Sequence, residues 1–423
     1  MTNQELMARR QAIMPRGVGQ AHAVFVDHAK NAEVWDVEGR RFIDFAGGIA
    51  VLNTGHLNDK VIGAVKAQLE RYTHTCFQVI AYEPLVELAE RLCKLAPGAT
   101  PKKAMFLTTG AEAVENAIKI ARAATKRSGV IAFGGGFHGR TMMGMALTGK
   151  VVPYKVGFGP FPGEIFHAPF PHPLHGVSVE DSLHAIEHIF KYDIEPSRVA
   201  AMIIEPVQGE GGFTVAPKEF MMALRKMCDQ HGILLIADEI QTGAGRTGTF
   251  FASEQMGIEP DMITLAKSMA GGFPISALIG KAAIMDAPEP GGLGGTYAGS
   301  PLGAVAALAV LDVFAEDKLL DRSKAVGERL TASLNRLKAE YKCIAEVRGL
   351  GAMVAFEVFN AEGKPDGDTV KKLVALAAQK GLILLSCGSY GNVVRILVPL
   401  TASDALLDEG MAIISNCMKE LGC

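Results

Sequence analysis

The chain has 423 residues, more than one hydrophobic core usually supports, so a large domain with a smaller companion is expected. Hydrophobic residues make up 49% of the chain and charged residues 21%, which excludes a disordered, fibrous or disulfide-scaffold protein. The formal charge of -3 excludes a global field that would recruit nucleic acid or an anionic membrane.

The N-terminal twenty residues are polar, carry Arg9, Arg10 and Arg16, and lack the apolar core of a secretion signal. No run of eighteen apolar residues follows, so we expect a soluble, cytoplasmic protein. The seven cysteines are odd in number and scattered, without a C-x-x-C pair. This pattern indicates reduced thiols rather than disulfides or a zinc knuckle, and we expect no metal site.

Residues 15–45 alternate around a D-V-E-G-R turn, which predicts a small antiparallel unit. From about residue 103, six short apolar runs alternate with segments of helical period: KAMFL, VIAF, AMIIEP, ILLIAD, MITLAK and SALIG. Such alternation predicts buried parallel strands joined by helices, hence an α/β fold. Ligands of such sheets bind beyond the carboxyl ends of the strands.

After about residue 315 the pattern changes to two helical stretches, near 318–341 and 368–380, separated by strand-like runs. We therefore expect a large domain over residues 46–315 and a small α+β domain over residues 316–423. The N-terminal segment, residues 1–45, is expected to pack with the small domain.

Three stretches match known nucleotide-binding or metal-binding motifs in sequence, but their context favours simpler explanations. Residues 243–248 (GAGRTG) match a dinucleotide fingerprint, but they lie five residues past a strand end and precede only a poor, short helix. Residues 144–150 (GMALTGK) resemble a nucleotide-binding loop, yet Val151 stands where a magnesium-binding hydroxyl is needed. His184 and His188 spell H-x-x-E-H within an amphipathic stretch, which favours solvated histidines on a surface helix.

Asp238 and Lys267, 29 residues apart, each close a predicted strand and should share one rim of the sheet. In isolation they could be a simple ion pair. Pyridoxal phosphate, however, needs a lysine for its aldehyde and an acid for its ring nitrogen. It also needs a helix N-terminus for its phosphate, which Gly110 and Ala111 can supply. Phe137 and Ile240 are candidates for the two faces of the ring.

The chain resembles the class III, or ω-, aminotransferases from residue 10 to residue 418, and within them the 4-aminobutyrate and 5-aminovalerate group. The matching stretches are DFAGGIAVLNTGH, TCFQVIAYEP, GAEAVENAIKIAR, FHGRT, EPVQGEGG, ADEIQTGAGRTG, TLAKSMAGGFP, GGLGGTYAGSP and LLSCGSYGNVVRILVPL. The resemblance implies a fold-type I pyridoxal-phosphate transferase, with a mostly parallel central sheet flanked by helices. It also implies a homodimer with shared active sites, with a tetramer left open.

The resemblance implies a role for each site residue. Lys267 is the Schiff-base lysine and the proton carrier, and Asp238 is the partner of the ring nitrogen. The further cofactor contacts are Gly110, Ala111, Phe137, His138, Glu205, Ile240 and Gln241, with Thr296 reaching the neighbouring subunit's phosphate. The substrate contacts are Ile49, Gln78, Arg140, Glu210 and Arg395.

The expected reaction moves the terminal amino group of 4-aminobutyrate to 2-oxoglutarate by ping-pong kinetics, giving succinate semialdehyde and L-glutamate. Arg140 would hold the distal carboxylate, while Glu210 would release Arg395 when 2-oxoglutarate binds. 5-Aminovalerate or another ω-amino acid is the alternative donor, since one methylene is worth only about 1–3 kcal/mol. A nicotinamide-dependent dehydrogenase using GAGRTG and a catalytically inactive relative are the weaker hypotheses.

Overall fold

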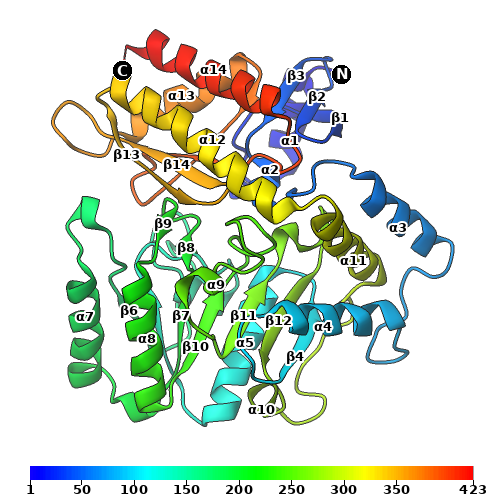
Figure 1. Ribbon diagram of the computed structural model, residues 1–423, viewed down its shortest axis with the longest axis vertical. Helices are drawn as coiled ribbons and strands as arrows, with labels where there is room; N and C mark the ends of the chain where they lie inside the picture. The colour runs from blue at the N-terminus through cyan, green and yellow to red at the C-terminus, as the bar shows by residue number, and fades with distance from the viewer. Residues whose placement is uncertain (423) are drawn as a thin grey trace.

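The computed structural model describes residues 1–422, and its centre is a seven-stranded sheet of order β4-β12-β11-β10-β7-β5-β6 (Figure 1). All neighbouring strands are parallel except β12, which runs antiparallel to both β11 and β4. The strands are β4 (Lys102–Leu107), β5 (Gly129–Phe133), β6 (Ile165–Ala168), β7 (Val199–Ile204), β10 (Leu234–Asp238), β11 (Met262–Leu265) and β12 (Ser276–Lys281).

The expectation that every apolar run is a parallel strand is wrong for the run SALIG, which forms β12. Residues 266–275 alone join β11 to β12, and they contain only the 3₁₀ turn η3 (Lys267–Ala270). A parallel return needs a crossover of about a dozen residues or more, usually through a helix. The short connection therefore reverses the chain.

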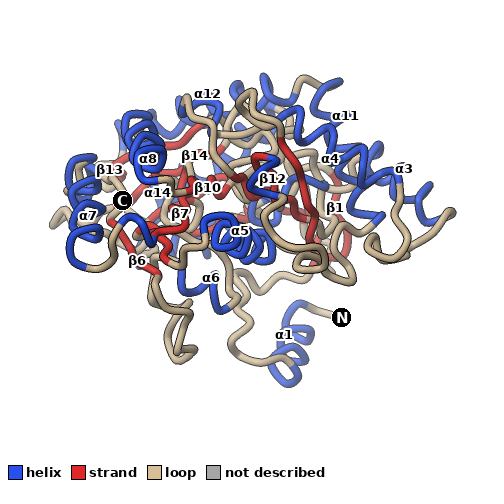
Figure 2. The backbone as a smooth tube through the Cα atoms, turned by 90° about the horizontal axis from the view of Figure 1, so that it is seen from below, coloured by secondary structure: helices blue, strands red, loops and turns tan. Residues whose placement is uncertain are grey.

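Helices cover both faces of this sheet, with α5 and α6 on one side and α8 on the other (Figure 2). The side chains of strand β7 are apolar on both faces of the sheet. Ala201 and Ile203 face α5 and α6, while Met202 and Ile204 face α7 and α8, so both faces need a covering layer of helices. These helices, with the others around the sheet, are α3 (Asp59–Leu69), α4 (Glu83–Leu95), α5 (Gly110–Thr125), α6 (Met142–Leu147), α7 (Val179–Tyr192), α8 (Lys218–His231), α9 (Ser253–Met256), α10 (Ala282–Met285) and α11 (Pro301–Glu316). The mostly parallel α/β fold is confirmed.

The N-terminal and C-terminal segments both lie above the seven-stranded sheet (Figure 1). The N-terminal strands form the expected antiparallel unit, and C-terminal β15 adds to it parallel to β3. A second sheet, β13-β14-β17-β16, is called the C-terminal sheet below. The elements are α1 (Asn3–Ile13), β1 (Val26–Lys30), β2 (Glu33–Asp36), β3 (Arg41–Asp44), α2 (Gly47–Ala50), α12 (Leu319–Glu340), β13 (Ile344–Leu350), β14 (Met353–Val358), α13 (Gly367–Gln379), β15 (Leu382–Ile383), β16 (Leu385–Cys387), β17 (Val393–Ile396) and α14 (Asp404–Leu421). The domain limits at residues 45 and 315 stay a prediction.

Two of the motifs set aside above lie in or next to helices of the fold. Residues 144–147 lie in helix α6, and the Lys150 Nζ donates to the Gly388 carbonyl at 2.8 Å. Both His184 and His188 lie exposed on α7. No helix in the described part of the chain is long and apolar enough to span a bilayer, and the compartment stays a prediction.

The GAGRTG loop joins the seven-stranded sheet to the C-terminal part of the chain through Arg246, whose side chain is fully buried. Its Nη1 donates to the Val398 carbonyl at 2.8 Å, and its Nη2 donates to the Asn53 side-chain oxygen. No carboxylate pairs with it in the hydrogen bonds and ion pairs of the described residues, and burial lowers the pKa of Arg246 to about 9. The loop is thus a structural joint.

Replacing Arg246 with Ala should destabilise the fold by about 3–5 kcal/mol, because it opens a cavity and leaves two buried oxygens unpaired. Urea unfolding followed by circular dichroism measures this loss. Arg329→Ala is the matched control, since its side chain makes only exposed ion pairs with Asp404 and Asp408. Equal unfolding midpoints for the two variants would show that Arg246 is not a structural joint.

Candidate active site

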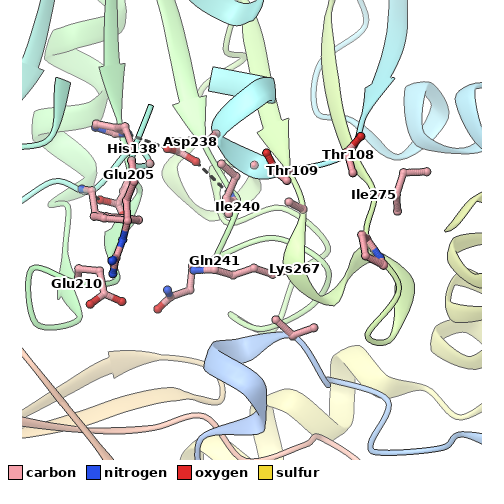
Figure 3. A pocket seen from close by; sticks show the side chains of 18 of the residues that line it. Thr108, Thr109, His138, Glu205, Glu210, Asp238, Ile240, Gln241, Lys267 and Ile275 are labelled. Carbon is pink, nitrogen blue, oxygen red and sulfur yellow. Dashed lines mark hydrogen bonds and ion pairs between the residues drawn. The ribbon is translucent and has the colours of Figure 1, made fainter. Parts of the chain in front are cut away.

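A cavity of about 490 Å³ lies beyond the carboxyl ends of the central strands, where the α/β fold predicts a ligand site. In Figure 3 the side chains of Glu210, Gln241 and Lys267 project into one space below the strand ends. Eleven of the residues selected from the sequence line this cavity: Gly110, Ala111, Phe137, His138, Arg140, Glu205, Glu210, Asp238, Ile240, Gln241 and Lys267.

Four other selected residues do not line the cavity. Arg395 lies behind Glu210, to which it is bonded. Ile49 is 42% exposed, and Thr296 and Gln78 are exposed as well. The Gln78 side chain donates to the Leu293 carbonyl at 3.0 Å and lines a separate pocket of about 330 Å³. A single chain therefore does not bring Ile49, Gln78 or Thr296 into its own cavity.

Lys267 does not close its strand as the sequence suggested. Strand β11 ends at Leu265, and Lys267 begins η3 with a φ of 49°. This left-handed conformation is unfavourable for a residue with a Cβ, costing about 1–3 kcal/mol. The chain turns sharply there and the side chain enters the cavity (Figure 3). Burial lowers the pKa of the Lys267 amine, which favours the neutral form that a base requires.

Asp238 ends β10 as predicted, and its carboxylate is 2% exposed. The His138 Nδ1 lies 2.7 Å from Oδ2, and the Thr264 hydroxyl donates to Oδ1 at 2.9 Å. Burial works against protonation of His138, but the hydrogen bond to Asp238 outweighs it and raises the pKa of the imidazole. The Asp238 carboxyl group is thus held in one orientation, suited to a protonated ring nitrogen.

Thr264 was missed by the sequence reasoning. It pairs with Asp238 in the register between β10 and β11, two strands whose order in the sheet the sequence did not specify. A polar residue within the apolar run MITLAK was the available signal.

Gly110 and Ala111 open α5, as predicted. Thr109 caps the helix, and the Glu112 carboxylate accepts hydrogen bonds from the Thr108 and Thr109 amides at 2.9 and 2.8 Å. A Cβ on Gly110 would come 2.9 Å from the Ile240 Cδ1, so glycine allows the helix end to approach the cavity wall. This N-terminus can hold a phosphate.

Phe137 and Gln241 line the cavity, and Tyr154 packs against Phe137 from outside this lining. The ring of Phe137 lies 5.0 Å from the ring of Tyr154, and the Arg140 guanidinium lies 5.3 Å from that same tyrosine ring. Tyr154 was another residue that the sequence reasoning missed. The Gln241 Oε1 is buried without a hydrogen-bond partner among the described residues, although Gln241 lines the cavity. An unpaired polar atom here fits a cofactor that brings its own polar groups.

Glu205 lies beside this network, at 7% exposure, just after β7. Its carboxylate accepts from the Phe137 amide at 2.8 Å and from the Gly209 amide at 2.9 Å. Burial raises the pKa of Glu205 to about 7, even though the charge of His138 works against that rise. This carboxyl group can therefore hold or release a proton near neutral pH.

Glu210 and Arg395 form a buried ion pair that joins the seven-stranded half of the molecule to the C-terminal sheet. The Arg395 Nη1 donates to the Glu210 Oε1, and the two side chains are 6% and 19% exposed. Burial would raise the pKa of Glu210, but the Arg395 charge outweighs it and lowers that pKa. Glu210 thus lines the cavity and neutralises the positive charge of Arg395, which lies behind it.

Comparison with known proteins gives one consistent result. The family model described as aminotransferase class III matches residues 13–418. The chain is 66% identical over 421 residues to 5-aminovalerate aminotransferase DavT of Pseudomonas putida, covering 99% of each. It is 57% identical over 421 residues to 4-aminobutyrate aminotransferase GabT of Escherichia coli, again covering 99% of each.

Solved structures agree with this family. A Bacillus anthracis aminotransferase superposes with a TM-score of 0.91 at 27% identity, covering 99% of this chain and 98% of that one. An ornithine aminotransferase of Toxoplasma gondii, whose active site holds partially occupied PLP, superposes with a TM-score of 0.88 at 29% identity. That match covers 100% of this chain and 95% of the Toxoplasma chain.

Glu205 should make stability depend on pH. Its pKa is about 7 in the folded chain and near the ordinary value of 4.5 when unfolded, so between these values the folded chain binds more protons. Stability contributed by this group is therefore present below pH 4.5 and lost as pH rises through 7. Glu205→Gln cannot titrate, so the melting temperature of the cofactor-free variant minus that of wild type should rise from pH 5 to pH 8.

Glu187→Gln is the matched control, because Glu187 is exposed on α7 and its substitution should give a difference that does not change with pH. A Glu205→Gln difference that stays constant across this range would contradict the raised pKa.

Proposed function

The chain belongs to the class III aminotransferases, and on that premise we propose that it moves the terminal amino group of an ω-amino acid to 2-oxoglutarate. It is a pyridoxal-phosphate enzyme of fold type I. The proposed products are the ω-semialdehyde and L-glutamate, released in two half-reactions. The single observation that carries this proposal is the Glu210–Arg395 ion pair at the cavity that Lys267 enters.

The cofactor fits the cavity through groups already described. The α5 N-terminus would hold its phosphate, Asp238 its ring nitrogen, Phe137 and Ile240 its two faces, and Gln241 a polar ring substituent. Once bound, pyridoxal phosphate supplies an electron sink for the carbon that loses a proton. Lys267 would carry that proton, since burial lowers the pKa of its amine and favours the neutral base.

The two half-reactions place different demands on the cations of the site. An ω-amino acid has no carboxylate next to its reacting carbon, while 2-oxoglutarate has one. Arg140 is exposed at the cavity and can bind the distal carboxylate of both substrates. Arg395 would stay paired with Glu210 while the donor is bound, because an unpaired buried guanidinium costs several kcal/mol. It would bind the second carboxylate of 2-oxoglutarate when Glu210 turns away.

A homodimer with shared active sites completes this proposal. Ile49, Gln78 and Thr296 were selected from the sequence as site residues, yet they lie exposed and outside the chain's own cavity. We propose that Thr296 of the partner subunit contacts the cofactor phosphate, and that Ile49 and Gln78 form the substrate entrance once the dimer covers them.

The donor we favour is 5-aminovalerate. From the sequence we expected 4-aminobutyrate, but a relative named for 5-aminovalerate is 66% identical and the Escherichia coli relative named for 4-aminobutyrate is 57% identical. 4-Aminobutyrate stays the second candidate, because the two donors differ by one methylene.

Arg395→Ala should separate the two half-reactions. In single turnovers followed by cofactor absorbance, we expect the donor half-reaction to change less than about fivefold. The half-reaction with 2-oxoglutarate should lose about 10²–10³-fold in kcat/KM, since a charge-assisted carboxylate contact disappears. Lys267→Ala is the control and should stop both halves. Equal losses in both halves for Arg395→Ala would contradict the proposed role of the Glu210–Arg395 pair.

Initial rates with 2-oxoglutarate should distinguish the donors. We expect kcat/KM for 5-aminovalerate to exceed that for 4-aminobutyrate by about tenfold, near the lower limit of what one methylene provides. L-Alanine, whose amine adjoins its carboxylate, should react poorly with Arg395 paired to Glu210. The reverse order of the two ω-amino acids would make 4-aminobutyrate the donor.

A further inference from the structure

Two histidines and a glutamate converge outside the proposed active site, between the seven-stranded sheet and the C-terminal sheet. His172 precedes the 3₁₀ turn η1 (Pro173–His175), His175 is its last residue, and Glu357 lies on β14. One ligand atom of each lies within 4.8 Å of the other two, and within residues 1–422 they form the one such group of three or more metal-binding side chains. We propose that His172, His175 and Glu357 bind a zinc-class divalent cation.

The interatomic distances suit a small cation. The His175 Nε2 lies 2.8 Å from the Glu357 Oε1, and the His172 Nε2 lies 4.0 Å from the Oε2. A tetrahedral zinc ion with bonds of about 2.0–2.2 Å holds its ligand atoms roughly 3.4 Å apart. To bind zinc, the distance from His175 to Glu357 must lengthen and the distance from His172 to Glu357 must shorten, each by roughly half an ångström. Rotation of the side chains can supply these changes.

The turn presents both imidazoles on one side. In a 3₁₀ turn, side chains three residues apart lie over one another. The His175 amide donates to the His172 carbonyl at 2.9 Å, and the His172 amide donates to the Val177 carbonyl at 2.9 Å. The two rings are perpendicular, with centroids 4.4 Å apart. The backbone thus fixes two nitrogen ligands before any ion binds.

Glu357 is oriented by neighbours that leave room for a cation. The Asn392 amide donates to its Oε1 at 2.9 Å, and the Arg348 Nη1 donates to its Oε2 at 2.6 Å. Each carboxylate oxygen accepts two bonds, so both can still face the histidines. The Arg348 charge is shared with Glu346, also at 2.6 Å, which limits its repulsion of an ion. Such supporting hydrogen bonds are typical of metal ligands.

A pocket of about 260 Å³ adjoins the three ligands and can hold water in the remaining coordination position. It reaches toward the active site through Gly388, whose amide donates to the Glu210 carbonyl at 2.9 Å. Because the histidines precede α7 and Glu357 belongs to the C-terminal sheet, a bound ion would cross-link two parts of the molecule. This inference does not depend on the proposed function, and it departs from the sequence expectation of no metal.

The test is titration of chelator-treated holoenzyme with zinc chloride, against a chromophoric zinc indicator. We expect one zinc ion per chain with micromolar or tighter affinity, and at least a tenfold loss of affinity in His172→Ala and in His175→Ala. Zinc should also raise the melting temperature of the wild type and not of these variants. The double variant His184→Ala/His188→Ala is the matched control and should bind like wild type.

His172→Ala guards against misfolding, because the hydrogen bonds given above for His172 are made by its backbone, while the His175 ring also bonds Glu357. Zinc affinity that survives in His172→Ala, or no stoichiometric zinc in the wild type, would overturn the proposal. So would an X-ray absorption spectrum with a sulfur ligand near 2.3 Å in place of nitrogen and oxygen near 2.0–2.2 Å.

Discussion

The candidate site depends on one physical constraint, the free-energy cost of burying charged side chains away from water. Asp238, Glu205 and Arg395 are all buried, the first two at the carboxyl edge of the sheet. Each has a specific partner: His138 and Thr264 for Asp238, two backbone amides for Glu205, and Glu210 for Arg395. These bonds fix side-chain positions before a ligand arrives, because an unpaired buried charge costs several kcal/mol. The arrangement is therefore preorganised.

The short connection between β11 and β12 has a large share in building the cavity. Lys267 lies within it at a positive φ, and Gly272, Phe273, Pro274 and Ile275 line the same cavity. A crossover helix would have carried this segment away from the strand ends. Because β12 is antiparallel, the short segment between β11 and β12 instead stays at the strand ends and forms one wall of the cavity. It lies close to Asp238, at the end of β10, which is next to β11 in the sheet.

Much of this could be predicted because strand ends and helix starts are local features. The run ILLIAD located Asp238, and the start of a helix after the run KAMFL located Gly110 and Ala111, without knowledge of distant contacts. The direction of β12 could not be predicted from its composition, because SALIG would suit either orientation. Thr264 and Tyr154 were missed because their roles depend on strand register and loop packing. The exposure of Thr296 also lay beyond local patterns.

Arg246 has a consequence for motion. Its guanidinium bonds the Val398 carbonyl, two residues past the strand that carries Arg395. The backbone behind Arg395 is therefore attached to the loop that follows Asp238, and separating the two sheets would break the hydrogen bonds that Arg246 donates to the Val398 carbonyl and the Asn53 side chain. A rigid-body movement of one sheet relative to the other is thus a costly way to make Arg395 available to the second substrate. Rotation of the Glu210 side chain about its own bonds is the cheaper route, and it leaves the sheets in place.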